Sequence, residues 1–277
     1  MGKKLVAVVL LACSMSLFAN CKGDDRHLYQ PTQVVLKTFE SRYPSAERVT
    51  WETKQNYQVA EFYTGANKSE AWFDGSGVWV MTETDISFKA LPSAVKTSFN
   101  ASAYATWKVD DVDQLERMSA ATIYIIETEL GEKEADLRYS ETGLLIKVIF
   151  DAGKDDKHQP VVIPELVRTA LLKKYPNALI LEYEMETTGL EVDILDKGIQ
   201  KDVCFNNAGQ WLSSEWDIRS DEAPAAVLNF LATSAYSTYR IDEVSALEKP
   251  AGMFYVFDMK QNNNEVTLTL SADGVLQ

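Results

Sequence analysis

Hydrophobic residues recur with two different periods along the chain, and the two periods alternate. Positions three or four residues apart predict a first short amphipathic helix: Val35, Thr38, Phe39 and Tyr43. Prolines favour the starts of three further helices, at Pro92, Pro164 and Pro224. After each helix come three or four segments in which polar and apolar residues alternate, as in half-buried strands. This order predicts an α+β fold of antiparallel meanders with the helices on one sheet face.

The sequence consists largely of two similar halves. Moving the sequence along itself by 132 residues places Tyr43-Pro44 on Tyr175-Pro176, and Trp79 on Trp211. The same shift superposes Asp85 and Asp217, Pro92 and Pro224, Tyr104 and Tyr236, Asp110 and Asp242, and Glu116 and Glu248. Self-similarity of this kind, with almost no gaps, indicates a duplicated module.

Each half is itself a pair, because one turn pattern occurs four times. An apolar residue, three small or polar residues, a glycine and an apolar run surround Gly77, Gly143, Gly209 and Gly274, which are 66, 66 and 65 residues apart. Glycine supplies the positive φ that such a hairpin turn needs. We therefore expect four helix–meander repeats, arranged as a first domain at 31–150, a polar linker at 151–160 and a second domain at 161–277.

The duplication also assigns the two faces of each predicted sheet, because strand residues alternate and matched positions must agree. The apolar, helix-packed face collects Val49/Leu181, Trp51/Tyr183, Ala60/Val192, Phe62/Ile194, Ala71/Val203, Phe73/Phe205, Val80/Leu212 and Ile86/Ile218. The opposite face collects Glu61/Asp193, Glu70/Asp202, Glu83/Glu215, Asp85/Asp217, Tyr63/Leu195, Trp72/Cys204 and Trp79/Trp211. Large aromatics among carboxylates are unusual on an open sheet face. Either an external partner covers this face, or the two domains pack it against each other or against loops.

Composition narrows the class of partner. The net charge is −14, and it becomes −16 once residues 1–20, with two lysines and no acids, are removed. Such a surface repels nucleic acid and anionic lipid and favours basic partners, although acids spread over a whole chain also serve solubility. Three cysteines, two of them near the start, do not form a disulfide scaffold, so the fold depends on its own core.

Little in the sequence indicates catalysis. The two histidines, His27 and His158, lie in the predicted tether and linker, which argues against a histidine triad or a zinc site. Ser93-x-x-Lys96 lacks the companion motifs of penicillin-binding enzymes. Asp74-Gly-Ser-Gly and Asp110–Asp113 lack the spaced ligand set of a calcium loop, and Cys204 is expected to be an inert, partly buried thiol. We expect no enzyme activity, no metal and no cofactor.

The order of these motifs resembles a known family. The helix exits read Tyr43-Pro-Ser-Ala46 and Tyr175-Pro-Asn-Ala178, the hairpins read aromatic-x-x-x-Gly-x-Trp, and helix starts read Leu91-Pro-Ser-Ala-Val95 and Ala223-Pro-Ala-Ala-Val227. This pattern is similar to the β-lactamase-inhibitor-like, PepSY-like family of secreted Bacteroides-type proteins, as two tandem domains over about residues 31–277. The resemblance implies a sheet with helices on one face and a non-catalytic binding or inhibitory role, and it carries no known site motif. Repeats two and four show Tyr104 and Tyr236 in place of the Tyr-Pro exit, so they fit the pattern more loosely.

The first thirty residues read as a targeting segment. Lys3 and Lys4 precede an apolar stretch too short to span a bilayer, which predicts a signal peptide at 1–20 and a tether at 21–30. Cys21, followed by Lys-Gly-Asp-Asp, resembles the lipidation and export signal of Bacteroides-like lipoproteins; lipidation at Cys13 and simple secretion remain alternatives. We expect an exported protein of the periplasm or outer membrane surface, touching a membrane only through a lipid anchor.

Three functions are compatible with these features. The first is a non-catalytic module that binds a protein or peptide, including a basic one, or inhibits a secreted enzyme. For this reading the candidate residues are Trp72, Trp79, Trp211, Glu61, Glu83, Asp85, Asp193, Glu215 and Asp217. The second is a glycan- or small-ligand-binding surface lipoprotein. The third is a carboxylate-dependent hydrolase using pairs such as Glu83 and Asp85.

Overall fold

The computed structural model describes residues 29–150, 159–187 and 189–277, and over these residues the chain forms two antiparallel sheets. The predicted signal peptide, the lipidation site at Cys21 and most of the linker lie outside the described residues. The first sheet runs in sequence order through β1 (Glu47–Lys54), β2 (Tyr57–Thr64), β3 (Asn67–Phe73), β4 (Trp79–Asp85), β5 (Lys108–Arg117), β6 (Ile123–Leu130), β7 (Lys133–Ser140) and β8 (Leu145–Phe150). The second contains β9 (Leu179–Glu186), β10 (Gly189–Asp196), β11 (Ile199–Asn206), β12 (Trp211–Asp217), β13 (Arg240–Lys249), β14 (Gly252–Gln261) and β15 (Asn264–Ser271).

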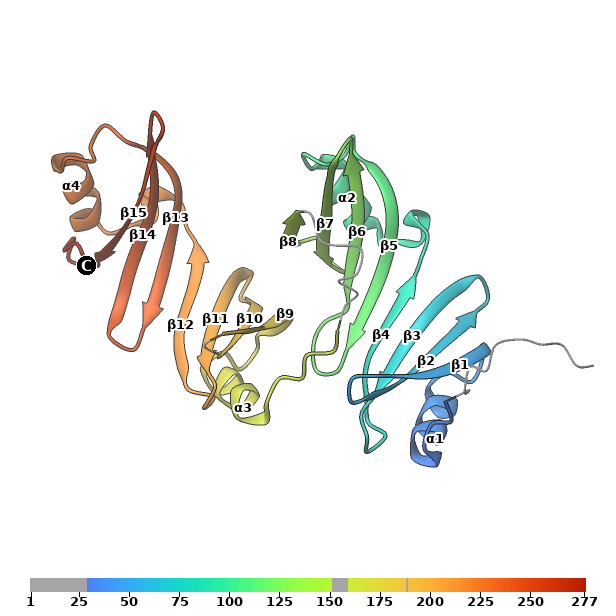
Figure 1. Ribbon diagram of the computed structural model, residues 1–277. Coiled ribbons are helices and arrows are strands. Elements are labelled where there is room, and N and C mark those ends of the chain that lie inside the picture. Colours follow the sequence, from blue (N-terminus) through green and yellow to red (C-terminus); the bar gives the residue numbers. More distant parts are fainter. Residues whose placement is uncertain (1–28, 151–158, 188) are drawn as a thin grey trace, which may run out of the picture.

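One helix precedes each run of strands: α1 (Gln33–Arg42), α2 (Ser93–Ala101), α3 (Glu165–Lys174) and α4 (Ala225–Thr233) (Figure 1). Short 3₁₀ turns at Phe88–Ala90 and Ser220–Glu222 lead into α2 and α4. The predicted α+β order of a helix followed by an antiparallel meander, repeated along the chain, is confirmed. Two repeats share each sheet, so each half of the duplication forms one continuous meander.

The helices cover one face of each sheet because their apolar stripes meet the inward positions of the strands. Val35 and Phe39 of α1 pack with Ala60, Phe62, Ala71 and Phe73. Val167 and Leu171 of α3 pack with the counterparts of those strand residues, Val192, Ile194, Val203 and Phe205. The corresponding clusters under α2 and α4 centre on Phe99 and Phe257. The buried side chains form these cores by removing apolar surface from water.

The four repeated glycines tie each hairpin to its helix. Gly143 has φ of 82°, and a β-carbon there would lie 2.6 Å from the carbonyl oxygen of Ala94 in the first turn of α2. Gly274 makes the same close approach to Ala226 in α4, where a β-carbon would lie 2.5 Å from its carbonyl oxygen. The turn therefore requires glycine both for its left-handed backbone and for the contact with the helix.

The second half packs against the first sheet on the face away from the helices. Leu181 of β9 joins a buried cluster with Trp72, Met81 and other residues of that face, and Leu195 of β10 packs against the same cluster. The backbone amide of Ala121 donates to the carbonyl of Ile180 at 2.8 Å. The two sheets therefore remain separate, with an edge of the second sheet seated on the surface of the first.

β-Bulges overturn part of the face assignment made from alternation. The register shifts between Glu182 and Ile180, so Leu181 leaves the helix-packed face and joins the contact with the first sheet. In β1 the matching shift lies between Glu47 and Thr50 and leaves Val49 exposed. Leu212 is likewise exposed, next to a shift in β12. A single inserted residue inverts the face of every position beyond it, which strict alternation cannot anticipate.

Candidate binding site

The carboxylates predicted for the face away from the helices lie in rows across neighbouring strands. Glu61 pairs with Glu70, and Glu70 with Glu83, in the first sheet. In the second sheet, Asp193 pairs with Asp202, and Asp202 with Glu215. Like charges directly opposite one another on a sheet are destabilising, so each row needs neutralisation, protonation or a ligand.

The three predicted tryptophans do not form an open surface with these carboxylates. Trp72 lies on the predicted face, but only 3% of it is exposed because Leu181 and its neighbours cover that face. Trp79 lies on the helix side, where its indole donates to Thr82 at 2.7 Å and Arg42 of α1 stacks over its ring. Trp211 repeats this arrangement with Ser214 at 2.9 Å and Lys174 of α3 over its ring.

Trp79 and Trp211 do not lie on the sheet face to which the sequence pattern assigned them. Bulges place Trp79 opposite Phe73, and Trp211 opposite Phe205, so both indoles share the helix-packed face. Trp72 illustrates the other open alternative, in which the domains cover this face by packing on each other. We therefore keep none of the three as a candidate contact residue for an external partner.

In the first half, lysines from neighbouring strands neutralise the carboxylate row. The amine of Lys68 lies 2.9 Å from Glu61, and that of Lys54 lies 2.8 Å from Glu70. The hydrogen bond that Lys68 donates to Glu61 raises the pKa of Lys68. At Lys54, burial lowers the pKa, but the hydrogen bonds that the amine donates to Glu70 and Glu52 raise it by more. The pKa of Lys54 is therefore also raised. These pairs make the Glu61–Glu83 row an internal charge network.

Asp113 is the most perturbed carboxyl of this face. It is 3% exposed, lies opposite Asp85, and has one buried oxygen without a hydrogen-bond partner among the described residues. Burial and the nearby charge of Glu83 raise its pKa to about 9, so the group is neutral at pH 7. Burial, followed by repulsion from Asp111, also raises the pKa of Asp85.

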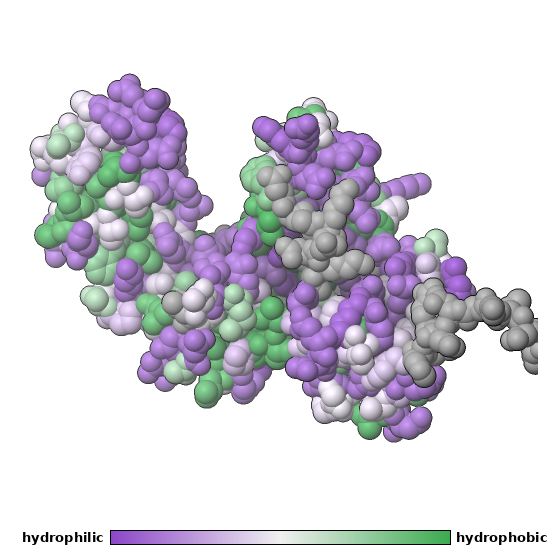
Figure 2. Space-filling model, viewed as in Figure 1, coloured by the Kyte–Doolittle hydropathy of each residue, from purple (hydrophilic) through white to green (hydrophobic). Residues whose placement is uncertain are grey.

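In the second half, a cavity of about 550 Å³ lies on the sheet face away from the helices. Five carboxylates line it from four adjacent strands: Asp202 of β11, Glu215 and Asp217 of β12, Glu243 of β13 and Asp258 of β14. The remaining lining comes from Leu145 and Ile146 of β8, the turn at Gly198–Gln200, Trp216 and Ser245. Figure 2 shows a hollow between the strands of the two halves, with a hydrophilic flank along β13–β15.

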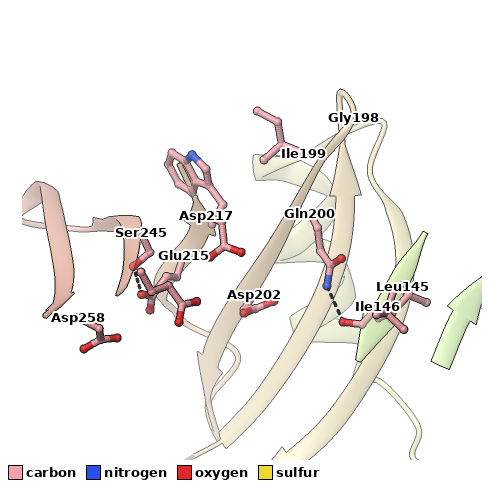
Figure 3. A pocket seen from close by; sticks show the side chains of 12 residues that line it. Leu145, Ile146, Gly198, Ile199, Gln200, Asp202, Glu215, Asp217, Ser245 and Asp258 are labelled. Atoms are coloured by element: carbon pink, nitrogen blue, oxygen red, sulfur yellow. Dashed lines mark hydrogen bonds between the residues drawn. The ribbon is translucent and has the colours of Figure 1, made fainter. Parts of the chain in front are cut away.

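Both halves of the chain build this cavity. Gln200 donates from Nε2 to the carbonyl of Ile146 at 3.1 Å, which joins the β10–β11 turn to the edge strand of the first sheet (Figure 3). On the opposite wall Ser245 donates to Glu215, and Thr267 donates to Asp258. An apolar wall at Ile146 thus faces a carboxylate wall on β12–β14.

The carboxylates of the cavity repel one another. Burial and the neighbouring Glu191 raise the pKa of Asp202 to about 6. Asp217 raises the pKa of Glu243, and burial with repulsion from Asp202 raises that of the adjoining Asp193 to about 7. Within the ranges the structure describes, no ion pair involves Asp202, Glu215, Asp217, Glu243 or Asp258. The cavity is therefore an unneutralised anionic site at pH 7.

Sequence reasoning identified only part of this site. Glu215 and Asp217 were candidates and line the cavity, and Asp193 adjoins it. Glu61, Glu83 and Asp85 belong to the first half and lie apart from it. Asp202 was on the predicted face and could have been selected, whereas Glu243 and Asp258 were missed because their strands had not been paired with β11 and β12. Trp216 was also missed, although it lies on β12 between Glu215 and Asp217.

The other residues considered for catalysis or metal binding make local structural contacts or are partly buried. Asp74 accepts hydrogen bonds from the amides of Ser76 and Val78, both at 2.9 Å, and so closes the hairpin turn. The amine of Lys96 donates to the carbonyl of Lys89 at 2.9 Å. Burial raises the pKa of the Cys204 thiol to about 11, which suppresses its thiolate form. Among the described residues, no group of His, Cys, Asp and Glu side chains is arranged to hold a metal ion.

Comparison with known families identifies the kind of module. The family model described as "Putative beta-lactamase-inhibitor-like, PepSY-like" matches residues 55–147 and 190–277. The chain belongs to the PepSY-like family. One match falls in each half, so this PepSY-like protein consists of two tandem copies, as its sequence motifs predicted. Strand β9, which makes the contact with the first sheet, lies between the matched regions.

Solved structures similar to the PepSY-like protein correspond to about half of its length. A BLIP-like protein from Bacteroides fragilis is 38% identical, and the match covers 50% of this chain and 100% of that protein, with a TM-score of 0.47. A DUF2874 family protein from Bacteroides ovatus is 30% identical, with 48% and 96% covered and a TM-score of 0.45. A comparison with curated proteins gives no match. The helices of the described residues are too short or too polar to cross a membrane.

Proposed function

We propose that this PepSY-like protein is a non-catalytic binding protein whose second sheet holds a basic segment of a protein partner in the anionic cavity. The observation that carries the proposal is the set of five carboxylates without ion-pair partners among the described residues, facing an apolar wall. A basic side chain with an aliphatic stem matches both walls, because its stem packs on apolar surface and its charged end pairs with carboxylates.

The proposed binding includes the inhibition of a secreted enzyme as the protein partner. The family description names an inhibitor-like module, and a strongly acidic surface steers basic proteins toward the site. The targeting segment that the sequence predicts at 1–20 is consistent with an exported location, where such enzymes are found.

A glycan-binding role is less consistent with the cavity. Trp216 lines the cavity and could stack on a sugar ring, but the amine of Lys201 already lies 4.8 Å from the centre of its ring. Five carboxylates also present acceptors without ion-pair partners in the described part of the chain, which favours a cation over a neutral sugar.

Charge neutralisation at the cavity tests the proposal. Glu215→Gln with Asp217→Asn is expected to weaken binding of a lysine- and arginine-containing peptide at least tenfold, measured by titration calorimetry in 50 mM salt. A tenfold change corresponds to about 1.4 kcal/mol. The matched control is Glu83→Gln with Asp85→Asn, the same positions in the first half, which should leave the affinity within about threefold of wild type.

Two outcomes would overturn the proposal. One is equal affinity of the wild-type protein for the basic peptide and for a glutamate-substituted peptide of the same length. The other is an equal loss of affinity in the cavity variant and the control variant. Binding of a neutral oligosaccharide with quenching of tryptophan fluorescence would favour the glycan alternative.

A further inference from the structure

The first half of the chain serves as an internal comparison for the cavity, because its carboxylate row is built from matched positions. Glu61, Glu70, Glu83 and Asp85 occur 132 residues before Asp193, Asp202, Glu215 and Asp217. The strand pairings agree: Lys68 lies opposite Tyr63, and its counterpart Gln200 lies opposite Leu195. Differences between the two rows therefore reflect side chains and not register.

The first half holds two lysine amines against its row. Lys68 on β3 is 2.9 Å from Glu61, and its side chain is one-third exposed. Lys54 on β1 is 2.8 Å from Glu70 and also pairs with Glu52 at 2.9 Å. The arrangement shows that carboxylates with this spacing on this sheet face hold ammonium groups.

Both lysines are absent from the second half. Glu186 stands at the position matching Lys54, and Gln200 stands at the position matching Lys68. Gln200 turns toward the first sheet and donates to the carbonyl of Ile146, as Figure 3 shows. Lys147 of β8 is engaged with Glu184 at the border of the row and lowers the pKa values of Asp193 and Asp202 only partly, and Lys201 pairs with Asp196.

We propose that the cavity binds a lysine side chain of the partner, whose ammonium group takes the place that Lys68 occupies in the first half. Asp202 and Asp217, which match the Glu70 and Asp85 that act on Lys68, then hold the ammonium together with the neighbouring Glu215, and the aliphatic stem lies along Ile146 and Ile199. This proposal rests on the proposed function and adds the identity of the bound group. The second copy has lost its internal counter-ions, and a partner supplies them.

Lysine is favoured over other cations by the matched geometry. An ammonium group is a compact charge with three donors, which can contact carboxylates on different strands, as the amine of Lys54 does with Glu52 of β1 and Glu70 of β3. The flat guanidinium of arginine prefers a two-pronged contact with one carboxylate. A free diamine carries the same ammonium but lacks the peptide backbone that a protein partner would place against the cavity rim.

Restoring the missing lysine tests the proposal. Gln200→Lys should fill the cavity with an internal ammonium and reduce affinity for a lysine-containing peptide at least tenfold. Gln200→Met is the matched control, because it removes the hydrogen bond to Ile146 but adds no charge, and its affinity should stay within about threefold of wild type. A peptide with arginine in place of lysine and free 1,5-diaminopentane are titrated alongside, and both should bind at least tenfold more weakly.

A second readout reports on the cavity without a ligand. In the Gln200→Lys variant, the carboxyl pKa of Asp202, followed by NMR titration, should fall below its wild-type value of about 6. If this pKa falls and peptide affinity does not, the lysine site is wrong although a basic segment still binds, so the proposed function survives. If wild-type protein does not bind the lysine peptide at all, both proposals fail. If the arginine peptide or the diamine binds more tightly than the lysine peptide, the lysine proposal is overturned, and the tighter ligand identifies the group that the cavity binds.

Discussion

At the scale of single residues, the buried carboxyl group of Asp113 lowers the stability of this fold at neutral pH. Asp113 is buried beside Asp85 and close to Glu83, and its pKa is raised to about 9. A carboxyl with a higher pKa in the folded state binds more protons there than in the unfolded chain. Its contribution to stability is therefore present at acid pH and is lost as pH rises from about 4 toward 9. The matched position in the second half is Ser245, which carries no such penalty.

Replacing Asp113 with asparagine should remove this pH dependence. We expect Asp113→Asn to raise the free energy of unfolding at pH 8 by about 1–3 kcal/mol, because one pKa unit corresponds to about 1.4 kcal/mol. The gain should be smallest near pH 4, where the wild-type carboxyl is protonated in the folded state and about half protonated in the unfolded chain, whose ordinary pKa is 3.8. Urea unfolding at pH 4, 6 and 8 measures the difference, and a gain that is the same at all three values would contradict the assignment of the penalty to this carboxyl.

At the scale of elements, strand β9 joins the two halves by inserting an acid between two arginines. Glu182 pairs with Arg117 of β5 and, at 3.0 Å, with Arg138 of β7. Arg117 also donates to the carbonyl of Leu181, and only about 5% of its side chain is exposed. A buried pair adds little over an apolar contact, but removal of one partner leaves a buried charge uncompensated. The contact therefore depends on all three side chains.

Loss of Glu182 should separate β9 from the first sheet. We expect Glu182→Ala to lower the free energy of unfolding by about 3–5 kcal/mol, because Arg117 and Arg138 stay buried without their partner. The same change should expose Trp72, which acrylamide quenching of fluorescence detects. The exposed residue Glu186 offers a control, since Glu186→Ala removes an acid from the same strand. Unchanged quenching in the Glu182 variant would show that the apolar cluster alone holds β9 in place.

At the scale of the whole molecule, duplication has produced two sheets with different roles. The face of the first sheet is closed by Leu181 and Leu195 from the second half, and its acids are paired with Lys54 and Lys68. The face of the second sheet stays open, and its cavity borrows Leu145 and Ile146 from the first half. Binding in the proposed site thus requires both halves, whereas the family model describes each as a similar module.

Separately produced halves should recognise each other. We expect chains of residues 29–150 and 159–277 to form a one-to-one complex, because the first alone would expose the apolar face around Trp72. Analytical ultracentrifugation of the mixture measures the association, and Glu182→Ala in the second chain should weaken it at least tenfold. Two stable monomers that do not associate would show that the connecting chain, and not this contact, keeps the halves together.

The sequence by itself determined the repeat structure, the α+β class, the helix positions and the family, because these depend on periodicity, glycine turns and short motifs that are local in the chain. It also placed Glu61, Glu83, Glu215 and Asp217 on the face away from the helices, since alternation holds within each strand. Bulges before Val80 and Leu212 reversed the faces of Trp79 and Trp211, and such insertions leave no trace in a hydrophobic pattern.

Only the tertiary structure decided which face is open. The burial of Trp72 and the cavity beside Ile146 both result from the way β9 and β10 meet the first sheet, through contacts between residues far apart in the sequence, such as Arg117 and Glu182, which are 65 positions apart. The two halves carry similar rows of carboxylates, and although Glu186 and Gln200 replace Lys54 and Lys68 in the second copy, the sequences do not state that one row is covered while the other faces a cavity. That distinction arises from packing between the halves, which no single strand or repeat encodes.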